Sequence, residues 1–210
     1  MASAVPHHLK ARKSPRQARA TATLDAICEA TIQLLVADGP HRLTTTRVAE
    51  RAGVSVGTMY QYFPHKQALL YALNERYLDV LSEKIEATCL AHHGSPLDLM
   101  VDALIETYWS AKTERADVTR ALYRTAVELD NEALIETFAA RVDAATLAMF
   151  ASASDWKCDD IASVNLTLVT VIFGTVRNAF ERNLSPAAIK ALRDHMLRMC
   201  RAYLETFTVN

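Results

Sequence analysis

The chain has 210 residues, half of them hydrophobic, and a mean hydropathy of +0.02. This apolar content is enough for a packed core, so a mainly disordered protein is excluded. Glycine, with 5 residues, and proline, with 6, are scarce, which indicates long helices rather than many short strands joined by turns.

Charge is distributed unevenly, although the formal net charge is only −1. Residues 1–78 contain 10 Lys or Arg and 5 Asp or Glu, whereas residues 79–210 contain 13 and 19. A basic front and an acidic rear indicate a polyanionic partner for the front alone. We therefore expect a mobile basic arm over 1–14, a first domain over 15–78 and a second domain over 79–210.

The cysteines and the N-terminus predict a cytoplasmic protein. Four cysteines stand far apart without a C-x-x-C motif, which is typical of reduced thiols and not of a disulfide framework: Cys28, Cys89, Cys158 and Cys200. Residues 1–13 lack the apolar core of a signal peptide. The most apolar segment, 161–176, contains Asn165 and several threonine or serine residues, so we expect a buried or interface helix and no membrane partner.

Motifs for catalysis are missing from the sequence. It contains no P-loop, and the pairs His7-His8 and His92-His93 lack the spacing of metal ligands. We expect no metal, no cofactor and no enzymatic activity.

Helix signals follow one another along the chain. Ser-Pro pairs supply a capping hydroxyl and a proline for the first helical position, and they occur at Ser14-Pro15, Ser95-Pro96 and Ser185-Pro186. Gly39 and Gly94 are stop signals. Between these marks apolar residues recur at spacings of three and four, and no segment alternates convincingly with period two. The pattern predicts an all-α fold of about nine helices.

A break between two short helices marks residues 44–63. The pattern predicts helices over 44–52 and 56–63, with Gly53 between them, where a sharp turn needs left-handed backbone geometry. Small and apolar residues have the spacing that packs two helices across a tight turn: Val48, Ala49, Ala52, Val54 and Met59. This pattern indicates a helix-turn-helix DNA-binding motif.

The second of these helices has an exposed face that can approach DNA. At about 100° per residue, Met59 and Phe63 share the core face, and Gly57 and Gln61 lie opposite them. Residues 52–72 contain no Asp or Glu, so this face does not repel phosphates.

Residues 43–70, LTTTRVAERAGVSVGTMYQYFPHKQALL, resemble the TetR family of transcriptional regulators. Its members typically show a threonine-rich helix start, A-x-x-A-G-V-S, then T-[LM]-Y-x-[YH]-F and a lysine three residues after the phenylalanine, and all of these are present. The resemblance covers about residues 15–77. It implies an all-helical homodimer, with a three-helix DNA-binding domain and a larger six-helix ligand-binding and dimerisation domain. We expect a ligand-responsive repressor that binds a near-palindromic operator and is released by a small-molecule effector.

The resemblance also implies which side chains contact DNA. Phosphate contacts are expected from Thr45, Ser55, Thr58, Tyr60, Tyr62 and Lys66, and base contacts from Thr46, Val56, Gly57 and Gln61. Arg47 adds a nearby guanidinium. Because the base-reading positions are uncharged, we expect DNA shape to supply part of the specificity.

The last part of the chain has the pattern of a dimer interface. One set of residues repeats at three and four along the final helix: Ile189, Leu192, Met196, Met199 and Tyr203. The segment 161–180, which includes Phe173 and Val176, is apolar on more faces than the core of one monomer needs. We expect these two helices to pair with their copies in a homodimer.

Aromatic and apolar residues between positions 95 and 156 are candidates for an effector pocket: Tyr108, Trp109, Tyr123, Phe138, Met149 and Phe150. Small-molecule sites are lined by such groups with a few polar ends. We expect a mainly apolar effector, and a neutral or cationic one because the rear domain is acidic.

Two alternatives remain open. Lys157 beside Cys158 favours a reactive thiolate, and Asp159 and Asp160 oppose it, which leaves a thiol-based redox regulator with the same DNA-binding motif. A helical protein-interaction module would contain similar helices, and salt-dependent DNA binding would separate it from a regulator.

Overall fold

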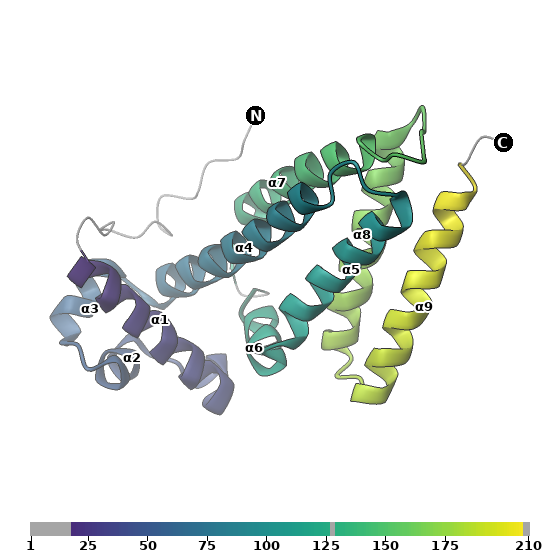
Figure 1. The fold of residues 1–210 in the computed structure, drawn as a ribbon. Helices are drawn as coiled ribbons and strands as arrows, with labels where there is room; N and C mark the ends of the chain where they lie inside the picture. Colours follow the sequence, from purple (N-terminus) through teal and green to yellow (C-terminus); the bar gives the residue numbers. More distant parts are fainter. Residues whose placement is uncertain (1–17, 127–128, 208–210) are drawn as a thin grey trace. The chain divides into compact units, whose positions relative to one another are not determined.

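The computed structural model describes residues 18–126 and 129–207, and this part of the chain contains helices and no strand (Figure 1). The expected all-α fold is confirmed there. Its elements are α1 (Ala18–Asp38), the 3-10 turn η2 (Pro40–Arg42), α2 (Thr45–Ala52), α3 (Val56–Tyr62), α4 (Lys66–Ala91), α5 (Leu97–Thr113), α6 (Ala116–Ala126), α7 (Glu132–Ala151), α8 (Ile161–Glu181) and α9 (Pro186–Glu205). The basic arm over 1–14 and the first Ser-Pro pair lie outside the described residues.

The described chain divides into two compact units. They are residues 18–78 with 117–126 and 129–136, and Asp79–Ala116 with residues 137–207. The charge pattern assigns 117–136 to the second domain, whereas the structure places the described residues of this segment in the first unit. The reason is that Val118, Ala121 and Leu122 of α6 are buried in the core of the first unit.

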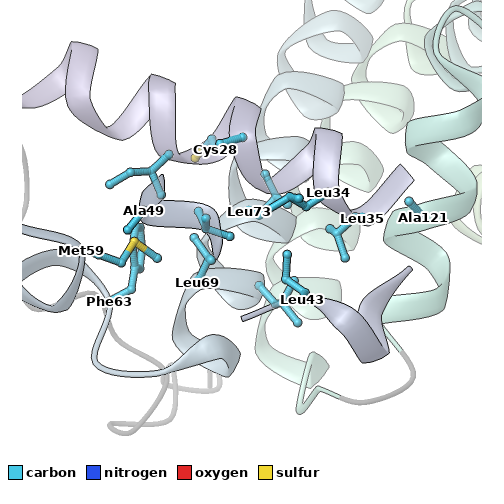
Figure 2. Packing of buried hydrophobic residues seen from close by; sticks show 14 of the residues in the cluster. Cys28, Leu34, Leu35, Leu43, Ala49, Met59, Phe63, Leu69, Leu73 and Ala121 are labelled. Carbon is cyan, nitrogen blue, oxygen red and sulfur yellow. The ribbon is translucent and has the colours of Figure 1, made fainter. Parts of the chain in front are cut away.

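The core of the first unit joins α1, the two short helices and the beginning of α4. Figure 2 shows Leu34 and Leu35 of α1 among these residues, with Ala49 of α2, Met59 of α3 and Phe63, which follows α3. Ala49 is completely buried, so a larger side chain would not fit without displacing its neighbours. This packing fixes the angle at which α3 leaves α2.

Local signals fix the ends of α2 and α3. The Thr44 hydroxyl accepts a hydrogen bond from the Arg47 N–H (3.3 Å), and the Ser55 hydroxyl accepts one from the Thr58 N–H (3.0 Å). Gly53 has φ 67° and ends α2, as the turn requires. The two helices are therefore joined by a short connection of defined geometry.

In the second unit α5, α8 and α9 pack against one another. The Ser185 hydroxyl accepts a hydrogen bond from the Ala188 N–H (3.2 Å) at the start of α9, as the Ser-Pro pair predicts. The pair before α5 works differently. The N–H of Leu97 donates to the carboxylate of Asp155 (2.9 Å), so a distant residue, and not Ser95, provides the cap.

Two helices, α1 and α8, are long and apolar enough to cross a membrane when only length and composition are considered. This is weak evidence, because core helices of soluble proteins meet the same criteria. In α8, Leu168 and Ile172 are buried within the second unit, whereas Leu166 is 60% exposed. The helix thus exposes one large apolar side chain, that of Leu166, which its own unit does not cover.

Candidate nucleic-acid interface

The helices α2 and α3 are two short, consecutive helices of the first unit. They are 8 and 7 residues long, and a turn over residues 53–55 connects them. The N–H of Val54 donates to the carbonyl of Ala49 (3.0 Å), and that of Gly53 donates to the carbonyl of Glu50 (3.2 Å). The turn is therefore held by backbone bonds as well as by the buried side chains on either side.

The four expected base-reading positions lie on the exposed surface of these helices. Thr46, Val56, Gly57 and Gln61 are all exposed, and Val56 shows 40% of its surface. A Cβ atom added at Gly57 would meet only the Ser55 hydroxyl, at 3.8 Å. This face is uncharged and open, which suits close approach to base edges in a major groove.

Hydroxyl groups border the open face. Tyr60 is 43% exposed, and its hydroxyl lies 3.5 Å from the Thr45 hydroxyl. The Ser55 and Thr58 hydroxyls are 2.8 Å apart at the start of α3. Such groups commonly donate to phosphate oxygens and fix the orientation of a protein on DNA.

Tyr62 and Lys66, also expected to contact phosphates, are less exposed. Tyr62 is only 6% exposed and packs in the core beside Phe63, with ring centroids 6.4 Å apart. The ammonium of Lys66 donates to the carbonyl of Pro40 (3.0 Å). Lysine has three N–H donors, so this bond leaves others for a phosphate.

A hollow of about 520 Å³ lies between the beginning of α1 and the α2–α3 turn. Its lining residues are Arg19, Ala20, Thr23, Gly53, Val54, Ser55, Thr58 and Tyr62. A guanidinium and several hydroxyls at one hollow suit an anion such as a phosphate. The contacts expected from the sequence include neither Arg19 nor Thr23, although their i, i+4 spacing places both on one face of the first helix.

Residues 43–74 contain three Lys or Arg, and each is bound within the first unit. Arg47 donates to the carboxylate of Asp38 (2.5 Å) and to the carbonyl of Arg42 (2.8 Å). Arg51 donates to the side chain of Gln33 (3.3 Å), and the third cation is Lys66. All three basic side chains thus have hydrogen-bond partners within the unit, and the four base-reading positions are themselves uncharged.

Two family models match the sequence that forms these units. The model of bacterial regulatory proteins of the tetR family matches residues 27–73, and the model of the tetracyclin repressor-like C-terminal domain matches residues 96–204. The chain belongs to the TetR family. It is accordingly a DNA-binding transcriptional regulator and not an enzyme, and α2 and α3 are its helix-turn-helix.

Similar proteins support the same assignment of this TetR-family chain. Nucleoid occlusion factor SlmA of Haemophilus ducreyi is 34% identical over 109 residues, which are 51% of this chain and 53% of that protein. HTH-type transcriptional repressor KstR of Mycolicibacterium smegmatis is 37% identical over 81 residues, which are 37% of this chain and 39% of that protein. The chain thus spans about half the length, or less, of these curated relatives.

The fold of this TetR-family chain is also found in solved structures. A TetR-family transcriptional regulator from Streptomyces coelicolor matches with a TM-score of 0.64 and 24% identity. The match covers 88% of this chain and 99% of that one. At this level of identity the likeness shows the fold alone.

Most of the expected effector residues are buried inside the second unit of the regulator. Tyr108, Trp109, Met149 and Phe150 are each less than 7% exposed, and Phe138 is half-buried. Tyr123 lies on α6 and belongs to the first unit, whereas the other five residues belong to the second unit.

The expected dimer residues of the TetR-family chain have different degrees of burial. Val176 and Met196 are buried within the second unit, at 1% and 2% exposure. Phe173, Ile189, Leu192 and Tyr203 are half-buried, and Met199 is 51% exposed. The period of three and four therefore mixes residues of the internal core with residues that are available to a second copy.

The cysteines also differ in exposure. Cys28, Cys89 and Cys200 are buried, whereas Cys158 is half-buried. Burial raises the pKa of the Cys28 thiol, and it raises the pKa of both Cys89 and Cys200 to about 11. These three thiols are therefore protonated at neutral pH and unreactive as nucleophiles.

Proposed function

We propose that this chain is a ligand-responsive repressor that binds a near-palindromic operator as a homodimer in the cytoplasm. The observation that carries the proposal is the open, uncharged face formed by Thr46, Val56, Gly57 and Gln61. A repressor is supported by the relative KstR, whose name describes an HTH-type transcriptional repressor.

On DNA, the exposed face of α3 enters the major groove. Gln61 pairs with the edge of an adenine, and the side chain of Val56 contacts a thymine methyl group. Thr45, Ser55, Thr58 and Tyr60 donate to phosphate oxygens along the groove, and the remaining N–H groups of Lys66 do the same. The hollow that Arg19 and Thr23 help to line receives a further phosphate.

The homodimer uses the surfaces of α8 and α9 that the second unit leaves uncovered. Leu166 is 60% exposed and Met199 is 51% exposed, so both can be buried by a second copy. A twofold axis then places the two reading helices one helical turn apart, at roughly 34–36 Å, on a near-palindromic site.

The effector binds within the second unit, near Tyr108, Trp109, Phe138, Met149 and Phe150, and it is mainly apolar like these residues. The effector releases DNA only if it binds one state of the dimer more tightly than the DNA-bound state. In that favoured state the two DNA-binding domains are wrongly spaced for the operator. Helix α4 runs from the first unit into the second, so it can transmit this preference.

The test is a gel shift with duplex DNA from the region upstream of the gene, next to a scrambled duplex of equal composition, over a range of salt concentrations. A regulator binds with an affinity that falls steeply with salt and prefers the upstream sequence. Absence of any salt-dependent shift would instead support a helical protein-interaction module.

Single substitutions separate base reading from phosphate binding. Gln61→Ala relaxes preference at one base pair, by about 1–3 kcal/mol, whereas Thr58→Ala weakens binding to all sequences alike. If both variants lose the same affinity on cognate and scrambled DNA, Gln61 is not a base reader.

A thiol-based regulator is the second candidate, because Cys158 is the half-buried cysteine and the other three are buried. Oxidation of the protein before a gel shift would then release DNA, and Cys158→Ser would abolish this effect. Release by an apolar compound under reducing conditions, unchanged in Cys158→Ser, supports the ligand-responsive regulator.

A further inference from the structure

Arg47 lies in the first turn of α2, and its side chain makes its hydrogen bonds within the first unit. Its two terminal nitrogens are both engaged: Nη2 donates to the carboxylate of Asp38 (2.5 Å) and Nη1 donates to the carbonyl of Arg42 (2.8 Å). The two bonds fix the planar guanidinium in both position and orientation. The carboxylate also neutralises its charge.

The acceptors belong to a well-defined connection between α1 and α2. Asp38 is the last residue of α1, Gly39 follows with φ 76°, and Pro40 is buried at the start of η2. The side chain of Asp38 is only 26% exposed, and that of Arg47 is 42% exposed. This pair is therefore less screened by solvent than a fully exposed ion pair.

Lys66 provides a contrast within the same unit. Its ammonium is bound to the carbonyl of Pro40, which is neutral, so the lysine keeps its full charge for a phosphate. Arg47 is bound to a carboxylate and does not. The α1–α2 connection thus leaves Lys66 charged. It neutralises Arg47, which lies next to the base-reading residue Thr46.

We infer that Asp38 is a specificity-determining residue, which keeps Arg47 away from DNA so that recognition depends on the uncharged face of α2 and α3. The inference rests on the DNA binding proposed above. A released guanidinium would bind any phosphate or any guanine within reach, and phosphate contacts add affinity without sequence information. Arg47, counted from the sequence among the DNA-binding residues, thereby becomes a residue that is withheld from DNA.

The inference predicts a gain of affinity on the wrong DNA. Asp38→Asn removes the charge and keeps the shape, so Arg47 becomes free to reach a phosphate. Each added phosphate contact increases the slope of log affinity against log salt by about 0.9 and the affinity at 0.1 M salt by about tenfold. Affinity for a scrambled duplex should rise by this amount, and the ratio of cognate to scrambled affinity should fall.

Asp25→Asn is the matched control. Asp25 of α1 forms an ion pair with Arg76 of α4 in the same unit, so this variant makes the same change in net charge and also frees an arginine. Arg76 lies outside the helix-turn-helix, so the salt slope and selectivity should stay near those of the wild type. A general effect of one lost carboxylate would instead appear equally in both variants.

Two further variants test whether Asp38 acts through Arg47. Arg47→Gln should bind DNA with the wild-type salt slope, and the double variant Asp38→Asn, Arg47→Gln should lose the gain seen in Asp38→Asn. Circular dichroism and thermal unfolding check that each variant is folded, and Arg47→Gln serves as the test if Asp38→Asn does not fold.

The decisive experiment is fluorescence anisotropy with both duplexes, for the wild type and all four variants. The salt concentration runs from about 0.05 to about 0.3 M, a range that includes physiological ionic strength. A folded Asp38→Asn with unchanged affinity for scrambled DNA overturns the inference alone, as does an Arg47→Gln whose salt slope falls by about one. Absence of DNA binding by the wild type and by Asp38→Asn overturns the proposed function as well.

Discussion

Tyr108 of α5 and Phe173 of α8 are stacked, with ring centroids 3.9 Å apart and planes inclined by 11°. Phe138 of α7 meets the same phenylalanine with centroids 5.7 Å apart. The Lys112 ammonium lies 5.4 Å from the centroid of the Tyr108 ring. Three helices of the second unit are thus tied together at one aromatic cluster.

Phe173→Leu should lower the free energy of unfolding by about 2 kcal/mol. The variant loses a stacked pair, worth about 0.5–1.5 kcal/mol beyond buried area, and leaves a gap in the cluster. Urea unfolding followed by circular dichroism measures the change. Leu90→Ala, at a position that is 79% exposed, is the control and should change stability by less than about 0.5 kcal/mol.

Stability should depend on pH through Lys112. Burial lowers the pKa of this lysine from 10.5 to about 7, and the residue is 2% exposed. Below pH 7 the amine is protonated in both the folded and the unfolded chain, and burying the charge costs stability. Between pH 7 and 10.5 the unfolded chain binds more protons, so this cost shrinks as the pH rises, by at most about 1.4 kcal/mol per pH unit.

Lys112→Met should therefore stabilise the protein most at about pH 6, below the pKa of the folded chain. The gain should shrink progressively at about pH 8 and about pH 9, between the folded and unfolded pKa. Comparing the variant with the wild type at each pH removes the contribution of the cysteines and tyrosines that titrate in the same range. Lys190→Met, at an exposed position of α9, controls for the loss of one charge. A gain that is equal at every pH would show that burial of the charged amine is not its cause.

Local chemistry made the helix-turn-helix predictable from the sequence. The threonine before α2, the serine before α3 and the glycine between them act on residues only a few positions away, and Gly53 adopts the left-handed geometry expected for it. Apolar spacing likewise placed Met59 and Phe63 in the core, where both are at most 2% exposed. The same helical period places Gly57 and Gln61 on the exposed face, whereas the full set of base-reading positions is what the resemblance to the family implies.

Long-range partners could not be predicted. Asp155 caps α5 from 58 residues away in the sequence, and no local pattern indicates that pairing. The ion pair of Arg47 with Asp38 depends on the path of the α1–α2 connection, so the charge count alone presented Arg47 as available. Helical spacing also cannot tell whether an apolar residue such as Met196 faces its own core or a second copy.

The two glycines of the helix-turn-helix should respond differently to alanine. Gly53 has φ 67°, where a Cβ atom is strained, so Gly53→Ala should lower the free energy of unfolding by about 1–2 kcal/mol. Gly57 has ordinary helical geometry and space around it, so Gly57→Ala should keep or slightly raise stability. Its new methyl group would stand on the base-reading face and alter DNA affinity. Wild-type DNA preference in Gly57→Ala would remove this residue from the interface.

Met199→Glu should convert the proposed homodimer into monomers without unfolding them. Met199 is 51% exposed in the single chain, so a carboxylate there remains hydrated in the monomer but would be buried, without a planned partner, in the dimer. Sedimentation velocity measures the change, at a protein concentration of about 1 μM, close to that used for DNA binding. Leu90→Glu introduces the same charge at a position outside α8 and α9 and should remain dimeric.

Met196→Glu, at a position only 2% exposed, should instead unfold the second unit, because its carboxylate would replace a core side chain. A wild type that sediments as a monomer would refute the dimer, and a Met199→Glu variant that stays dimeric would place the interface away from this face of α9.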